Sequence, residues 1–304
     1  MKKIIFTLSF CFISLFAEKI NVTVSILPQK YFVEQIAGDK VNVNTMVKSG
    51  FSPATYEPQT SQMKTLSDSQ VYFSVGVPFE NVWIERFKNT NTSLLVVDTS
   101  EGITKLKMEK HEHHEDEDEH HEAEHEEEHH QDTHKDEAEH HEDGLDPHTW
   151  LDPLLVKIQA KNIYETLIKI DDENKLFYTT NYHNFLKQLD ILNQKLESKL
   201  KSVAHKPFMV FHPSWGYFAK RYNLEQIVVE KEGKEPKPKE IIELIKDAKE
   251  HQIKIVLVSP QFSQKAAKTV AQSINAEVIS IDHLTYDYPI GLMNTAKVIY
   301  NSYQ

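Results

Sequence analysis

Short apolar segments rich in β-branched residues alternate with amphipathic segments along two stretches of the chain. The first stretch predicts four strands at residues 20–27, 41–47, 71–75 and 94–97, with helices at 29–37, 59–68 and 79–88. The second predicts strands at 208–211, 227–229, 253–258 and 278–281, with helices at 215–222, 239–251, 264–274 and 290–300. Near-continuous apolar strands between helices are typical of mostly parallel sheets covered on both faces. We therefore expect an α/β fold of two lobes, each with a roughly four-stranded sheet.

A single long helix is predicted between these two stretches. Residues 171–203 contain no Pro or Gly, and Leu189, Leu192, Leu196 and Leu200 follow one another at steps of three and four. A helix of this length would span about 50 Å, which is longer than one small domain. We expect it to be a rigid helix that lies along both lobes, with an N-terminal lobe at 18–170 and a C-terminal lobe at 204–304.

The N-terminus has the pattern of a secretory signal. Two lysines are followed by an apolar run at residues 4–17 that ends on a small residue, Ala17. This run is too short to favour a membrane-spanning anchor, so residues 1–17 are predicted to be a cleaved signal peptide and the mature protein to be periplasmic. Cys11, the one cysteine, lies inside this signal. The mature chain would then have neither a disulfide nor a cysteine ligand.

Almost all of the net charge of −12 lies in one segment. Residues 111–143 hold 17 acidic side chains, one Lys and 11 of the 17 His, so the rest of the chain has a net charge of +4. Such a composition cannot form a core, and we expect a disordered insertion that binds soft or borderline divalent metals loosely. This binding should fade as the pH falls through about 6–7, because protons compete for imidazole. No basic stripe for nucleic acid and no glycine motif for nucleotides is present.

The insertion also matches the zinc-protease pattern HExxH, at residues 121–125 and 125–129. A segment so rich in His and Glu produces about one such match by chance. No apolar face would hold the required helix in place, so the matches do not indicate a protease.

Three residues outside the insertion are candidate metal ligands. His212 and Asp282 each end a predicted strand, and ligands collect at the carboxyl edge of open α/β sheets. His148 follows the insertion in a loop that two prolines stiffen. Two imidazoles and a carboxylate can hold zinc with a fourth position open. Three other histidines lie on polar segments and are expected to be solvated: His183, His205 and His251.

Five motifs resemble the zinc-binding periplasmic components of ABC importers, the ZnuA-like proteins of the metal-binding cluster A-I. They are SGFSPATYEP, DPHTWLDP, VFHPSWGYFAKRY, EGKEPKPKEI and VISIDHL, and the acidic His-rich insertion is typical of the zinc branch. The resemblance implies two α/β lobes joined by a long rigid helix, with Zn²⁺ bound between them as transported cargo. It implies the ligands His148, His212 and Asp282. It also implies a monomer that delivers zinc to an inner-membrane permease with a cytoplasmic ATPase.

One position departs from this family. Its first ligand is a His in a segment resembling PHTYEP, and here that position is Ala54. Water, Tyr56, Glu57 or a His of the insertion would complete the site, and water is the favoured hypothesis. If none does, the insertion alone would store metal.

Two other function classes stay open on the sequence. A zinc hydrolase would use the same three ligands around an activated water. However, Glu57 and Glu235 are the only candidate general bases near the motifs, so no enzyme activity is expected. A periplasmic metal buffer or an adhesin differs from a transport protein mainly in lacking a permease partner.

Overall fold

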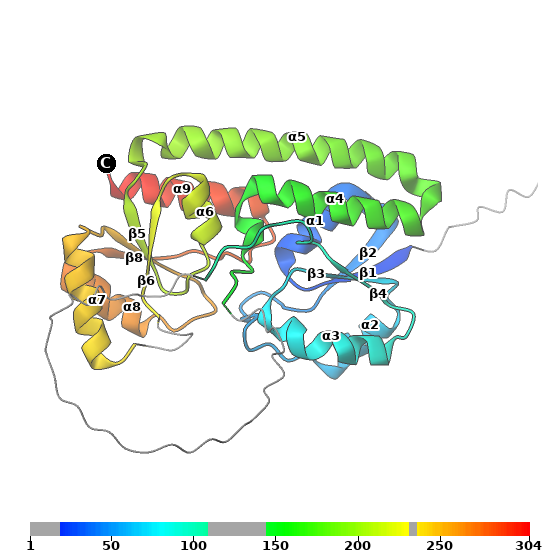
Figure 1. The fold of residues 1–304 in the computed structure, drawn as a ribbon, viewed down its shortest axis with the longest axis horizontal. Helices are drawn as coiled ribbons and strands as arrows, with labels where there is room; N and C mark the ends of the chain where they lie inside the picture. Colours follow the sequence, from blue (N-terminus) through cyan, green and yellow to red (C-terminus); the bar gives the residue numbers. More distant parts are fainter. Residues whose placement is uncertain (1–18, 109–143, 231–235) are drawn as a thin grey trace, which may run out of the picture.

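The computed structural model describes residues 19–108, 144–230 and 236–304 (Figure 1). The expected signal peptide with Cys11, the insertion at 111–143 and Glu235 lie outside the described residues.

The first lobe is built on a four-stranded parallel sheet. The strands are β1 (Ile20–Val24), β2 (Val41–Thr45), β3 (Val71–Ser74) and β4 (Leu95–Asp98), in the order β2-β1-β3-β4. The connecting helices are α1 (Leu27–Ala37), α2 (Thr60–Ser67) and α3 (Pro78–Thr90). In Figure 1, α2 and α3 lie below the sheet and α1 lies above it.

The second lobe repeats this plan. Its strands are β5 (Pro207–Val210), β6 (Glu225–Val228), β7 (Ile255–Val258) and β8 (Glu277–Ser280), all parallel, in the order β6-β5-β7-β8. Its helices are α6 (Gly216–Arg221), α7 (Pro238–Glu250), α8 (Lys265–Ile274) and α9 (Tyr288–Ser302). The prediction of two lobes with four-stranded parallel sheets is confirmed.

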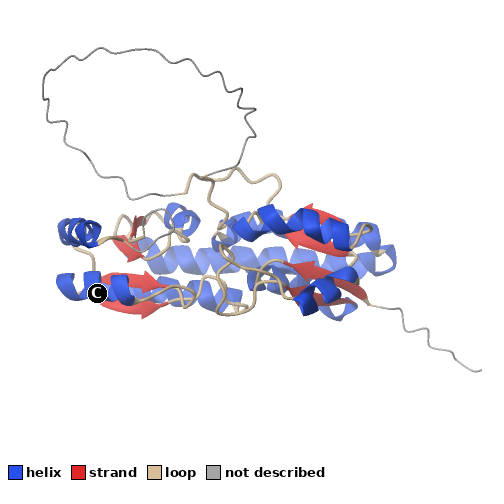
Figure 2. Ribbon diagram, turned by 90° about the horizontal axis from the view of Figure 1, so that it is seen from below, coloured by secondary structure: helices blue, strands red, loops and turns tan. Residues whose placement is uncertain are grey.

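A long helix joins the lobes, as predicted. Helix α5 (Lys175–Leu200) has 26 residues, and the 3₁₀ turns Asp172–Asn174 and Lys201–Val203 flank it. It packs against α1 in the first lobe and against α9 in the second. Figures 1 and 2 show it extending alongside both lobes.

Helix α4 (Pro153–Ile170) is absent from the predicted elements. It buries Val156, Ala160, Ile163 and Leu167, a helical spacing that the sequence contains. Asp152 caps it by accepting a hydrogen bond from Leu154 N at 2.8 Å. The helix packs along α5 and continues directly from the DPHTWLDP loop, so it fixes that loop against the body of the protein.

The first strand is shorter than predicted. The expected strand 20–27 ends at Val24, and α1 already begins at Leu27. The buried side chain of Gln29 accepts hydrogen bonds from Ser25 N and Ile26 N, so these two residues turn the chain into the helix.

None of the helices in the described ranges is long and apolar enough to cross a membrane.

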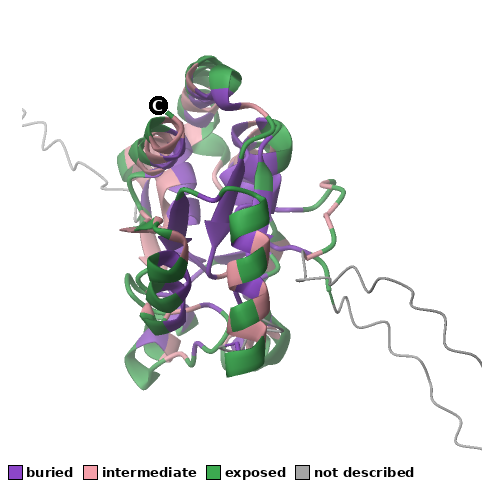
Figure 3. Cartoon of the chain, turned by 90° about the vertical axis from the view of Figure 1, so that its left-hand side faces the viewer, coloured by how far each residue is buried: buried purple, intermediate pink, exposed green. Residues whose placement is uncertain are grey.

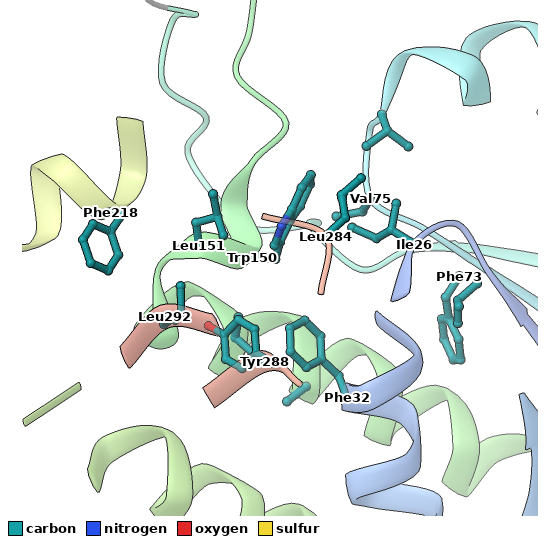
Figure 4. Packing of buried hydrophobic residues seen from close by; sticks show 14 of the residues in the cluster. Ile26, Phe32, Phe73, Val75, Trp150, Leu151, Phe218, Leu284, Tyr288 and Leu292 are labelled. Carbon is teal, nitrogen blue, oxygen red and sulfur yellow. The ribbon is translucent and has the colours of Figure 1, made fainter. Parts of the chain in front are cut away.

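One apolar core runs through both lobes. Apolar residues of β1, β3, α4, α5, β5 and α9 belong to a single buried cluster, and a smaller cluster lies between the second sheet and α7 and α8. Figure 3 shows the buried strands of the second lobe between helices with exposed outer faces. In Figure 4, Trp150 lies beside Leu284, Val75 and Ile26, where the carboxyl ends of the two sheets meet. The two lobes are therefore packed as one unit.

Candidate metal centre

Every strand of the second sheet is followed by a polar side chain. Glu230 comes two residues after β6, His212 two after β5, Ser259 directly after β7 and His283 three after β8. The carboxyl ends of parallel strands share one edge of a sheet, and open α/β sheets bind ligands at that edge. The four side chains therefore gather there.

Three histidine rings lie next to one another at this edge. His148, from the loop before α4, has its ring centroid 5.3 Å from that of His212 and 5.6 Å from that of His283. The centroids of His212 and His283 are 6.3 Å apart. His148 and His283 are buried, whereas 17% of the His212 side chain is exposed. The open side of the cluster is therefore at His212.

Each of the three rings is held at Nδ1 by an oxygen atom. The pairs are His148 with Asp146 Oδ1 at 2.7 Å, His212 with Glu230 Oε1 at 2.7 Å, and His283 with Ser259 Oγ at 2.8 Å. Histidines that bind metals are oriented in this way, by a hydrogen bond at the nitrogen that does not touch the metal. Among the described residues, these bonds leave Nε2 of each ring available to an ion.

Burial keeps two of the imidazoles in the form that binds metals. It lowers the pKa of His148, which His212 lowers further, and it lowers the pKa of His283, which His148 and then His212 lower further. Burial also raises the pKa of Asp146 to about 7, against the hydrogen bond from His148 N and the charge of His212. Neutral imidazole is the ligand form, and a dication would favour the ionised form of Asp146.

Side chains from both lobes hold this region in place. Trp150 Nε1 donates to the His283 carbonyl at 2.9 Å. Tyr217 Oη donates to the Asp146 carbonyl and accepts from Leu106 N, both at 2.9 Å. Phe262 stacks on the His212 ring, with centroids 4.7 Å apart.

Asp282, the predicted carboxylate ligand, lies next to His283 in the chain. Its Oδ1 accepts hydrogen bonds from Gln261 Nε2 at 2.8 Å and from Leu284 N at 2.9 Å. In the described ranges no group of three or more His, Cys, Asp or Glu side chains closes around one point tightly enough to hold an ion. Imidazoles on one tetrahedral zinc have ring centroids about 5 Å apart, so the three rings need to converge slightly on binding.

Comparison with known proteins identifies the family. The family model described as "Zinc-uptake complex component A periplasmic" (ZnuA) matches residues 22–299. This chain belongs to the ZnuA family.

Individual relatives are similar over most of the chain. A high-affinity zinc uptake system protein ZnuA of Bacillus subtilis is 26% identical over 264 residues, which cover 86% of this chain and 77% of the relative. A crystal structure of ZnuA is 37% identical with a TM-score of 0.81, covering 93% of this chain and 99% of the other. A zinc-bound deletion mutant of ZnuA is 36% identical with a TM-score of 0.80, covering 94% and 98%.

The segment in which the family resemblance implies a histidine at position 54 lies in the first lobe. Ala54 is exposed, and its backbone N–H donates to Ser52 Oγ at 3.3 Å. The Tyr56 hydroxyl is buried and donates to Gln62 Oε1 at 2.7 Å, so it is already engaged inside the lobe. Glu57 is exposed. The histidines of the insertion lie outside the described residues.

The structure places the rings of His148 and His212 next to each other, as expected from the sequence. It adds His283 and Glu230, for which the sequence predicted no role. His283 directly follows Asp282, and Glu230 ends the apolar run QIVVE. Both follow a strand in the same way as His212, so the position after each strand was the signal that pointed to them. The three histidines predicted to be solvated, His183, His205 and His251, are exposed.

Proposed function

We propose that this protein captures Zn²⁺ outside the cytoplasm and delivers it to the permease of an ABC importer. The observation that carries the proposal is the group of adjacent imidazoles, each held at Nδ1, at the junction of the lobes in a chain of the ZnuA family. The zinc is cargo. The Bacillus subtilis relative is named as a zinc uptake system protein, which supports this assignment.

His148 and His212 are proposed as zinc ligands, with Asp282 as the carboxylate ligand. Neutral imidazole suits zinc, whereas oxygen-only sites suit manganese and magnesium. His148 comes from the first half of the chain, and His212 and Asp282 come from the second lobe. A shift of either ligand-bearing loop on docking would then change the coordination geometry and release the ion.

The proposed role involves no covalent chemistry. A zinc hydrolase needs a carboxylate or imidazole free to act as a general base near the bound water. When Nε2 of His148 and of His212 binds the metal, Nδ1 of each ring carries the proton and donates a hydrogen bond to Asp146 or Glu230. These two carboxylates therefore position ligands. Glu57 is exposed in a loop. These features support a binding protein.

The cellular setting follows from the same proposal. Residues 1–17 would direct export to the periplasm, and the mature protein would act as a monomer. Its partner would be an inner-membrane permease with a cytoplasmic ATPase. The His-rich residues 111–143 would collect zinc near the site.

Growth under zinc starvation tests this function. Deleting the gene should stop growth in the presence of a zinc chelator, and added zinc should restore it. Wild-type protein should complement the deletion, whereas a His148→Ala variant should not, and a His183→Ala variant should serve as the matched control. Complementation that persists after loss of the permease would instead support a metal buffer.

A further inference from the structure

We infer that His283 is a zinc ligand of this protein and supplies a third imidazole to the site, in place of the one missing at Ala54. The inference rests on the proposed function and assigns a ligand within its site.

The position of His283 matches that of the two predicted histidine ligands. Its ring centroid is 5.6 Å from that of His148 and 6.3 Å from that of His212. Three imidazoles on one tetrahedral zinc would have centroids about 5 Å apart, so a small convergence of the rings suffices. A ligand from another part of the chain is not needed to obtain a third nitrogen.

Among the described residues, the hydrogen bonds of His283 leave its ring atom Nε2 available to an ion. Its Nδ1 pairs with Ser259 Oγ at 2.8 Å, and its carbonyl accepts from Trp150 Nε1. Its Nε2 makes none of the hydrogen bonds found among the described residues. Some polar side-chain atoms of the described residues are fully enclosed and have no hydrogen-bond partner, but His283 Nε2 is not one of these atoms. A buried imidazole whose Nδ1 is held by the protein, and whose Nε2 is neither paired among the described residues nor sealed in the core, is able to offer Nε2 to an ion.

Asp282 can bind the same ion as its neighbour. Its Oδ1 accepts from Leu284 N at 2.9 Å, a bond that turns the chain tightly around His283. The hydrogen bonds of Asp282 among the described residues use Oδ1, which leaves Oδ2 for the metal. Together with His148 and His212, these two residues give four protein ligands, and no water is required to complete the tetrahedron.

Cobalt binding to the full-length mature chain tests the role of His283. A competing chelator keeps free Co²⁺ low enough that only the tightest site is filled, and both the affinity and the d–d absorption spectrum of the bound ion are measured. The variants are His283→Ala, His148→Ala and the matched control His183→Ala, which removes an exposed histidine of α5. Circular dichroism of the metal-free variants verifies that they fold.

His283→Ala should weaken the tight site by at least about 100-fold and change the spectrum of the remaining bound cobalt, because an oxygen replaces a nitrogen. His183→Ala should change neither quantity. If the spectrum per bound ion is unchanged in His283→Ala, His283 is not a ligand, even when the affinity falls. If the tight site survives in His148→Ala, the ion is bound elsewhere, and the proposed function fails together with this inference.

Discussion

The Trp150 indole donates a hydrogen bond from Nε1 to the carbonyl oxygen of His283, over 2.9 Å. Trp150 lies two residues after His148, on the loop that leads into α4, and His283 lies on the loop after β8. The bond therefore joins the two loops that carry buried histidines of the metal centre. The indole is itself fully buried in the core shared by the lobes, so the distance between these loops is held by packing as well as by the bond.

Trp150→Phe keeps an aromatic ring at this position but removes the donor. The His283 carbonyl then loses its partner inside the protein, which should lower the free energy of unfolding by about 1–3 kcal/mol. Zinc affinity should fall as well, because the His283 loop is less well positioned. Urea unfolding of the metal-free protein checks the first effect. Trp83→Phe, at a partly exposed site on α3, is the control. An equal loss of unfolding free energy in both variants would mean that the hydrogen bond from Trp150 to His283 does not stabilise the fold.

Asp152 joins the lobes through a second contact. Its Oδ2 accepts from Arg221 Nη2 at 2.7 Å, while its Oδ1 caps α4. Asp152→Ala removes both interactions, and the free energy of unfolding should fall by about 2 kcal/mol. Asp190→Ala breaks a partly exposed pair with Lys157 and should cost less than about 1 kcal/mol. Thermal unfolding of both variants measures the difference, and equal costs would mean that the Asp152 contacts do not stabilise the fold.

Glu80 makes stability depend on pH. Burial raises its pKa from 4.5 to about 7, although Ser25 Oγ and the backbone N–H groups of Val75 and Gly76 donate to its carboxyl. Between these two pH values the folded protein holds a proton that the unfolded chain has released. The free energy of unfolding therefore falls as the pH rises through this window, by up to about 3 kcal/mol.

Glu80→Gln should remove this dependence. The buried histidines have the opposite effect, since their lowered pKa values make stability fall as the pH drops below 6.5. Subtracting the unfolding free energy of Glu80→Gln from that of the wild-type protein isolates the contribution of the Glu80 carboxyl. This difference should decrease from pH 4.5 to pH 7. The exposed Glu85→Gln should give a constant difference. A constant difference for Glu80→Gln would show that its carboxyl titrates normally.

The repeating pattern of strands and helices was sufficient to predict both sheets and the long helix. Each apolar strand is followed by a helix of its own, so local periodicity and the parallel topology agree. Helix α4 was not predicted because it follows the loop motif without a break, and Pro147 and Pro153 are typical of an extended loop. Pro153 is in fact the first residue of α4, a position at which proline is well tolerated.

The metal centre could be predicted from the sequence only in part. His212 and Asp282 could be found because each ends an apolar run, and His148 because it lies in a stiff loop. The pairing of His212 with Glu230 and of His283 with Ser259 depends on which strands are neighbours in the sheet. Strand order is a tertiary property, and no local pattern of residues specifies it.

A histidine at position 54 should compensate for the loss of His283. Ala54 occupies the position of the first His ligand implied by the family resemblance, and its side chain is exposed. Adding Ala54→His to His283→Ala should recover at least about tenfold of the lost zinc affinity, since an imidazole again completes the site. Competition with a zinc chelator measures the recovery, and Ala54→Gln in the same background is the control. Equal affinities of the two double variants would count against an exchange of ligands.

We expect the tight zinc site to lie between the lobes and not in the His-rich insertion. Calorimetric zinc titration of the mature protein, with and without residues 111–143, distinguishes these two locations. One tight site that survives the deletion and disappears in His212→Ala is the predicted result. Weak, multiple binding that is lost together with residues 111–143 would contradict the claim and identify the insertion as the metal store.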